Sequence, residues 1–215
     1  MHLVSVNVGL PREVEWHGRW IRTSIWKSPA EGSVHVGALN LEGDQQSDLS
    51  VHGGADKAVY AYPREHYEYW RRELGAKDPP WGAFGENFTT HGLLEPDVRI
   101  GDRLRAGSAE FLVTQPRMPC FKLGIRFGRD DMVKRFLRSG RTGFYLAVLR
   151  EGEVARGNPL EFVGHDDHGV TVADIAALYA RDMDNADLLR RVVEVPALPE
   201  GWKKYFRQRL FEPDA

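Results

Sequence analysis

The chain has 215 residues, enough for one domain of ordinary size with a small appendage. Hydrophobic residues make up 42% and charged residues 28%, a balance typical of a folded protein rather than a disordered one. A formal net charge of −2 argues against a dedicated nucleic-acid binder, and no apolar run approaches the roughly 20 residues that span a bilayer.

The sequence contains a single cysteine, Cys120, which excludes an internal disulfide and a zinc site built on several cysteines. A lone thiol is typical of a reducing compartment, and the first residues lack the pattern of a signal peptide. We therefore expect a cytoplasmic protein that has neither a membrane nor a nucleic acid as its partner.

Short runs of alternating or β-branched residues predict the strands, which in chain order are 3–8, 34–36, 39–41, 57–62, 103–105, 110–114, 143–149 and 160–163. The turn at 151–153 predicts a hairpin between 143–149 and 154–156. Two helices are expected among these strands, at about 64–74 and 130–137. Many short strands with frequent turns favour a barrel or a sandwich over a doubly wound sheet.

The end of the chain differs, since only two of the 22 glycines lie beyond residue 165. Thr171 and Asp174 have the spacing of a capping box, which predicts a helix start. Apolar residues at helical spacing then predict three small amphipathic helices, around 172–179, 188–193 and 202–210. Exposed apolar positions on these helices would be compatible with a homodimer.

The segment 115–123 holds the only thiol and is the first candidate for chemistry. It follows a predicted strand, and two prolines stiffen the backbone around Cys120. If Arg117 and Lys122 also lie close in space, their charge favours the thiolate, the form that attacks electrophiles and binds soft metals. A buried, inert Cys120 is the alternative, since free cysteine often behaves as a small hydrophobe.

A second candidate is the run His52-Gly53-Gly54-Ala55-Asp56-Lys57. Paired glycines let backbone N–H groups converge on an anion, and Lys57 adds charge. The spacing matches neither a Walker A loop nor a dinucleotide fingerprint. An ordinary Gly-Gly turn that leads into the next strand is the alternative.

Three further groups carry weaker signals. Glu86 and Asn87 lie among glycines and can bind a polar ligand or tie down their own loop. Arg141 precedes a strand and can clamp a phosphate or carboxylate, although a solvated arginine is the alternative. The run 165–168 has two His and two Asp without the spacing of a helical metal site, so we predict a linker.

Four motifs, taken in order, resemble the MOSC-domain family, named after the C-terminal domain of molybdenum cofactor sulfurases. They are 52–60, Phe84-Gly85-Glu86-Asn87, Ile100-Gly101-Asp102 and 115–120. Their order, their spacing and the helical tail are similar to the YiiM-like branch, so the resemblance covers nearly the whole chain. It implies a mainly β, MOSC-type barrel-like domain over residues 1–165 and a C-terminal three-helix domain over residues 166–215.

The resemblance implies that Cys120 is the family's key thiol, which in related members binds the molybdenum of a molybdenum cofactor (molybdopterin). The implied activity is the reduction of small N-hydroxylated substrates, such as hydroxylaminopurines, to amines. Pyridoxal phosphate binding is a further property associated with the family. The sequence has no flavin or nicotinamide fingerprint and no cysteines for an iron–sulfur cluster, so electrons would come from a separate electron-donor protein.

A molybdopterin is a large anion, so its pocket needs converging donors, cations and one soft ligand. We expect Cys120 as the metal ligand, and the other contacts from Gly53, Gly54, Asp56, Lys57, Asn87, Arg117, Lys122 and Arg141. Glu86 or His52 is expected to deliver a proton. Two alternatives stay open: a carrier of persulfide sulfur on Cys120 for cofactor or metal–sulfur cluster assembly, and a non-catalytic binder of a phosphorylated small molecule.

Overall fold

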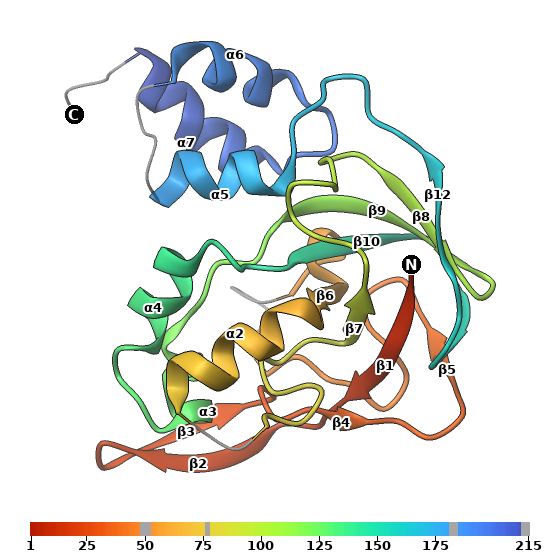
Figure 1. Cartoon of the computed structure of the whole chain (residues 1–215), viewed down its shortest axis with the longest axis vertical. Helices are drawn as coiled ribbons and strands as arrows, with labels where there is room; N and C mark the ends of the chain where they lie inside the picture. The colour runs from red at the N-terminus through yellow and green to blue at the C-terminus, as the bar shows by residue number, and fades with distance from the viewer. Residues whose placement is uncertain (48–52, 76–77, 181–184, 212–215) are drawn as a thin grey trace.

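The structure is a computed structural model that describes residues 1–47, 53–75, 78–180 and 185–211 (Figure 1). Its strands are β1 (His2–Val8), β2 (Arg12–Trp16), β3 (Arg19–Thr23), β4 (Ser28–Pro29), β5 (Ser33–Val36), β6 (Val59–Pro63), β7 (Phe88–His91), β8 (Arg103–Ala106), β9 (Ala109–Pro116), β10 (Phe144–Arg150), β11 (Gly152–Ala155) and β12 (Leu160–Gly164). Its helices are η1 (Ala55–Lys57), α2 (Glu65–Leu74), α3 (Phe121–Phe127), α4 (Met132–Ser139), α5 (Val172–Ala180), α6 (Ala186–Glu194) and α7 (Glu200–Phe211). The mainly β fold class and the helical tail are therefore confirmed.

Eight strands form one mixed sheet in the order β12-β8-β9-β10-β6-β7-β1-β4. All neighbours are antiparallel except β6 and β7, which α2 connects as a parallel pair. The pairs β2–β3 and β5–β11 form two small separate ribbons. This large sheet brings β6, β9 and β10 side by side, and the candidate site lies at their ends.

The barrel expected from the sequence does not close, because the sheet stays open between its two ends. Near that opening, β1 meets the start of β12 through a single bridge between His2 and Pro159. Pro159 has no N–H to donate, so a regular ladder cannot continue through it. A few backbone hydrogen bonds, such as Leu3 N–H to the Asn158 carbonyl at 2.9 Å, join the two parts instead.

The expected hairpin between 143–149 and 154–156 is also wrong. Strand β11 pairs with β5, with Gly152 opposite Val36. Strand β10 has no free edge for it, because β9 and β6 already flank β10 on its two sides. The expected strand at 39–41 is reduced to one bridge between Leu41 and Val36.

Two apolar clusters fill the interior. The larger one joins the sheet to the tail helices, and Phe88 and Phe111 meet edge-to-face within it at 5.5 Å. The smaller one is aromatic and lies under α2 and α4, with Tyr62, Trp70 and Phe136 fully buried. It includes Leu123 of α3, so it packs against the segment that carries Cys120.

The tail helices begin as the sequence predicts. Thr171 Oγ1 accepts from the Asp174 N–H at 3.1 Å, and Asp174 accepts from the Thr171 N–H at 2.9 Å, a complete capping box. Helices α5 to α7 lie together over one end of the sheet (Figure 1). The division of the chain at residue 165 stays a prediction. Within the described ranges, no helix has the length and apolarity that a membrane span requires.

Candidate functional site

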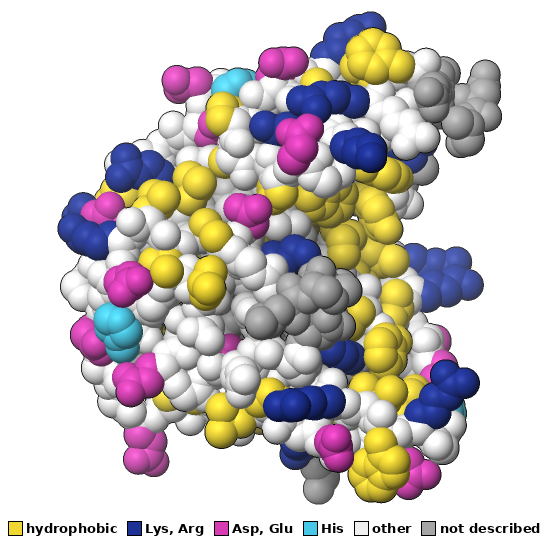
Figure 2. Space-filling model, turned by 180° about the vertical axis from the view of Figure 1, so that it is seen from behind, with side chains coloured by type: hydrophobic (Ala, Val, Ile, Leu, Met, Phe, Trp, Pro, Cys, Tyr) yellow, Lys and Arg dark blue, Asp and Glu magenta, His cyan; other side chains and the backbone are white. Residues whose placement is uncertain are grey.

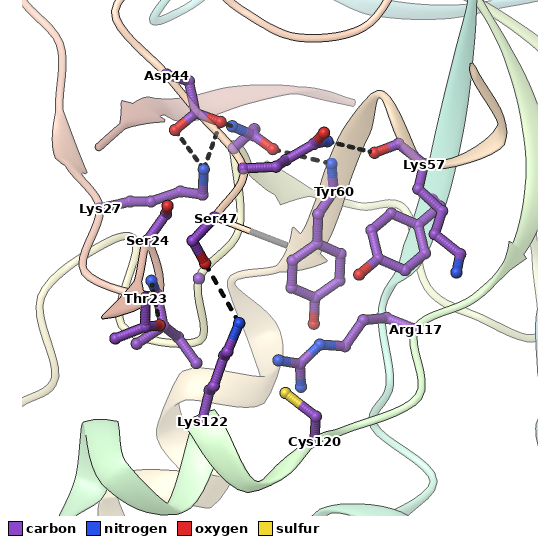
Figure 3. Close-up of a pocket in the computed structure, with 15 residues that line it drawn as sticks. Thr23, Ser24, Lys27, Asp44, Ser47, Lys57, Tyr60, Arg117, Cys120 and Lys122 are labelled. Atoms are coloured by element: carbon purple, nitrogen blue, oxygen red, sulfur yellow. Dashed lines mark hydrogen bonds and ion pairs between the residues drawn. The ribbon is translucent and has the colours of Figure 1, made fainter. Parts of the chain in front are cut away.

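A pocket opens beside Cys120 where several distant parts of the chain meet (Figure 3). Its walls come from the end of β3 and the residues after it, from residues 44–47, from β6 and β10, and from the segment that joins β9 to α3. Counted together with its open mouth, the empty space of the pocket is about 590 Å³.

Cys120 ends the extended segment that follows β9 and stands directly before α3. Its backbone is extended, with φ −120° and ψ 172°, and its side chain makes no capping hydrogen bond. The half-buried sulfur lines the pocket and points toward Arg117 (Figure 3). The alternative of a thiol sealed in the core therefore does not hold.

Arg117 places a buried cation in the same wall. The residue is only 6% exposed, and its Nη1 has no hydrogen-bond partner among the described residues. Its guanidinium lies 5.3 Å from the ring centre of Tyr60. Burial by itself lowers the pKa of Arg117, but Tyr60, Tyr145 and Cys120 together raise it above its usual value. Arg117 is thus charged at neutral pH and lacks an anionic partner within the described chain.

Tyr60 and Tyr145 face each other across β6 and β10, with ring centres 5.4 Å apart. Burial raises the pKa of both phenols, so both keep their protons at neutral pH. Tyr60 donates its hydroxyl hydrogen to the Thr142 carbonyl at 2.8 Å. The two rings therefore supply no negative charge to balance Arg117.

The opposite wall is a buried network around Asp44. Its carboxylate accepts from the Lys27 ammonium, from the Gly9 N–H at 2.8 Å and from Asn87 Nδ2 at 2.9 Å. Asn87 in turn accepts from the Tyr60 N–H at 3.1 Å. Burial lowers the pKa of Lys27, although Asp44 opposes that effect. The only carboxylate among the described lining residues is thus already engaged.

The pocket as a whole is positive. Lys122 contacts Ser47 Oγ at 3.2 Å, and burial is the main cause that lowers the pKa of Lys57. With Lys27 and Arg117, the described lining residues carry four cationic side chains against one carboxylate. Ser24 Oγ, also in the lining, is buried without a partner in the described chain. Such a pocket favours a polar, anionic ligand.

The structure brings together five of the residues expected from the sequence, Lys57, Asn87, Arg117, Cys120 and Lys122. Another three, Gly53, Gly54 and Asp56, line an adjoining groove under the tail helices that shares Lys57 with the pocket. His52 lies outside the described residues.

Glu86 and Arg141 do not line the pocket, contrary to expectation. Glu86 is fully buried and accepts hydrogen bonds from the Tyr67 hydroxyl, from Thr89 Oγ1 at 2.9 Å, and from the N–H groups of residues 82 and 84. Its carboxylate therefore holds its own loop in place, which is the alternative to ligand binding that the sequence left open for Glu86. Arg141 stacks on the Tyr69 ring at 3.8 Å, so it does not act as a clamp on the pocket's ligand.

Several pocket residues gave no signal in the sequence. Ser24, Lys27 and Asp44 belong to no motif, and only the packing of their segments against β6 shows their role. Tyr60 and Tyr145 become neighbours through the register of two strands 85 residues apart. The polar run 165–168 forms no group of three metal-binding side chains, nor does any other part of the described chain.

Replacing Glu86 by glutamine tests its structural role. The variant puts an NH₂ group against backbone N–H donors, so we expect it to lower the free energy of unfolding by about 1–3 kcal/mol. Because burial raises the pKa of Glu86 above about 4.5, the folded state of the wild type holds this proton more tightly than the unfolded state. The contribution of Glu86 to the free energy of unfolding of the wild type is thus present at about pH 4.5. It is lost as pH rises through the pKa that Glu86 has in the folded state.

Glutamine does not titrate, so the stability deficit of the variant should shrink as pH rises from about 4.5. Urea unfolding at several pH values measures this deficit. A deficit that grows with pH would show that the folded pKa of Glu86 lies below its usual value.

The fold and the site together define a β-rich domain with a cationic pocket and one thiol, joined to a small helical unit. The sequence matches the MOSC domain over residues 48–161 and the YiiM-like, 3-alpha helix domain over residues 170–211. The chain belongs to the MOSC-domain family, in its YiiM-like branch.

Relatives and solved structures agree with this placement. The chain is 41% identical to YflK of Bacillus subtilis over 96% of its own length and 93% of that protein. The crystal structure of YiiM from Geobacillus stearothermophilus superposes with a TM-score of 0.81 at 37% identity, covering 97% of this chain and 98% of that one. A protein of Gibberella moniliformis named Reductase is 36% identical over 68% of this chain, which corresponds to 26% of that protein.

Proposed function

We propose that the pocket beside Cys120 binds a molybdenum cofactor and that the protein reduces N-hydroxylated compounds to amines. The observation that carries the proposal is the buried Arg117, whose Nη1 lacks a partner in the described chain, next to the only thiol. A buried cation without an anionic partner costs free energy unless an anion joins it. A phosphate-bearing cofactor with a thiophilic metal satisfies both groups at once.

The residues of the pocket fit such a group. Arg117, Lys57 and Lys122 can hold its negative charge, and the buried Ser24 hydroxyl can bond to it. Cys120 Sγ is the one thiolate that the sequence offers to the metal. When bound, the cofactor supplies a two-electron redox centre, and the protein supplies position and charge.

The proposed reaction balances with two electrons and two protons. The N–O bond of R–NH–OH breaks, the amine R–NH₂ forms, and the oxygen leaves as water. Because no electron carrier is encoded in the sequence, we assign the electrons to a separate electron-donor protein. In place of Glu86, we assign proton delivery to the Tyr145 hydroxyl, one of several protonated groups in the pocket wall. Burial raises its pKa, so it carries its proton at neutral pH.

Support for reduction also comes from the relative named Reductase, of which this chain matches 26%. That name belongs to the larger protein, so the activity stays our proposal for this chain. Pyridoxal phosphate, the other ligand associated with the family, also bears a phosphate. Pyridoxal phosphate has no metal for the Cys120 thiol to bind, and therefore we favour the molybdenum cofactor.

Protein purified from cofactor-making and cofactor-deficient hosts tests the proposal. We expect stoichiometric molybdenum, fluorescent pterin oxidation products and dye-driven reduction of a hydroxylaminopurine only from the first host. Protein from the first host without molybdenum and pterin would overturn the proposal. A gain of one sulfur atom on Cys120 in the intact mass, without molybdenum, would establish the persulfide carrier instead. Phosphate-ligand binding that survives Cys120→Ser but is lost in Lys57→Ala would indicate the non-catalytic binder.

A further inference from the structure

A second groove adjoins the pocket, between the Gly53–Gly54 turn and helices α5 and α7. Figure 2 shows the molecule hollowed between its helical part and its body, with hydrophobic side chains gathered along the hollow. The tail contributes three aromatic side chains to this groove, from Tyr179, Trp202 and Tyr205. The proposed cofactor chemistry uses none of them.

The groove and the pocket lie on the two sides of one extended segment. Gln115 and Met118 face the groove, whereas Arg117 and Cys120 face the pocket. Two residues of extended chain span at most roughly 7 Å, so a ligand in the groove lies within one small molecule's length of the thiol. Lys57 lines both cavities and joins them.

The aromatic side chains of the groove pack against one another at an angle. The Tyr179 and Trp202 ring centres are 5.5 Å apart at 75°, and those of Tyr179 and Tyr205 are 5.7 Å apart at 46°. Trp202 Nε1 donates to Gln115 Oε1 at 2.8 Å, which fixes the indole to strand β9. Tyr179 is still 38% exposed, so part of its ring is open to a ligand. Rings in this arrangement can stack on a flat guest and also meet its edge.

The floor of the groove offers polar partners for the rim of a flat ring. Gly54 has φ +99° and open space where a side chain would stand, so its backbone is accessible. The Asp56 carboxylate also lines the groove and can accept from ring N–H groups.

We propose that this groove binds the planar heteroaromatic ring of the substrate, with Trp202 and Tyr179 as specificity-determining residues. The inference rests on the proposed reductase function and assigns the substrate's ring to the groove and its N–OH group to the pocket. It predicts selection of flat N-hydroxylated bases over hydroxylamine itself, which has no ring to place in the groove.

Binding of adenine, a flat base that cannot be reduced, tests the groove separately from the reaction. Calorimetric titration of the full chain should give weaker adenine binding in Trp202→Ala and Tyr179→Ala by roughly tenfold, the size of one lost stacking partner. Tyr179→Ala keeps the test valid if Trp202→Ala fails to fold. The matched control is Trp20→Ala, which removes a 70% exposed ring from β3, outside the groove. Unchanged adenine binding in both groove variants would overturn the inference.

Kinetics on cofactor-loaded protein provide the second measurement. We expect Tyr179→Ala to lower kcat/KM for a hydroxylaminopurine roughly tenfold, with unchanged kcat/KM for hydroxylamine and unchanged molybdenum content. An equal loss of kcat/KM on both substrates would overturn the inference. A loss of molybdenum would also overturn it, because the groove would then hold the pterin. If the wild type binds adenine but reduces neither compound, the proposed function fails and the groove stands as a base-binding site.

Discussion

Replacing Cys120 by serine is expected to remove the molybdenum and the reductase activity while the fold stays intact. Serine has nearly the same shape but offers a hard, protonated hydroxyl where a soft metal needs a thiolate. Loss of a direct metal ligand should lower turnover by roughly 100-fold or more. The Cys120 side chain is half-buried and makes no capping bond, so we expect stability to change by less than about 0.5 kcal/mol.

Molybdenum content, pterin content and thermal unfolding of the variant, prepared beside the wild type, measure these effects. We expect pterin to fall less than molybdenum, because the cationic side chains around the pocket remain. The matched control is Phe121→Ser at the next position, whose side chain is 53% exposed and lines neither cavity. A Cys120→Ser variant with full activity and full molybdenum would refute the thiolate ligand.

Replacing Arg117 by methionine should have opposite effects on stability and on binding. The guanidinium is buried without an ion pair in the described chain, and both neighbouring tyrosines are neutral at pH 7. Methionine has a similar length and fits the aromatic surroundings, so removing the charge should raise the free energy of unfolding by about 1 kcal/mol or more. The same change removes charge-assisted hydrogen bonds to an anion, so ligand binding should weaken roughly 10- to 100-fold.

Urea unfolding of ligand-free protein and titration with inorganic phosphate measure the two effects. Arg141→Met is the matched control, since this arginine stacks on Tyr69 outside the pocket. We expect that control to bind phosphate as the wild type does. An Arg117→Met variant that is less stable than the wild type and keeps its cofactor would show that the guanidinium serves the fold.

Local patterns determined much of the secondary structure. Alternating or β-branched runs predicted β1, β5, β6, β8, β9, β10 and β12. Strands β5 and β8 alternate because one face of each is buried, whereas β6 is buried on both faces. The capping box predicted the start of α5, since its two hydrogen bonds join residues only three positions apart. Helix α3 was missed because it has only seven residues, too few for its periodicity to show.

The sequence by itself also determined part of the site. Arg117, Cys120 and Lys122 share one short segment, so their proximity in space follows from their proximity along the chain. The resemblance to the MOSC family rested on motifs of this local kind, and the family assignment is confirmed.

Only the tertiary structure decided which charges face the segment that carries Arg117, Cys120 and Lys122. It buried Glu86 in its own loop, placed Arg141 outside the pocket, and brought in Lys27 and Asp44 from segments without a motif. Strand order likewise left the sheet open and paired β11 with β5. These outcomes depend on contacts between residues far apart in the sequence, whose free energies arise from burial and register and leave no local pattern to read.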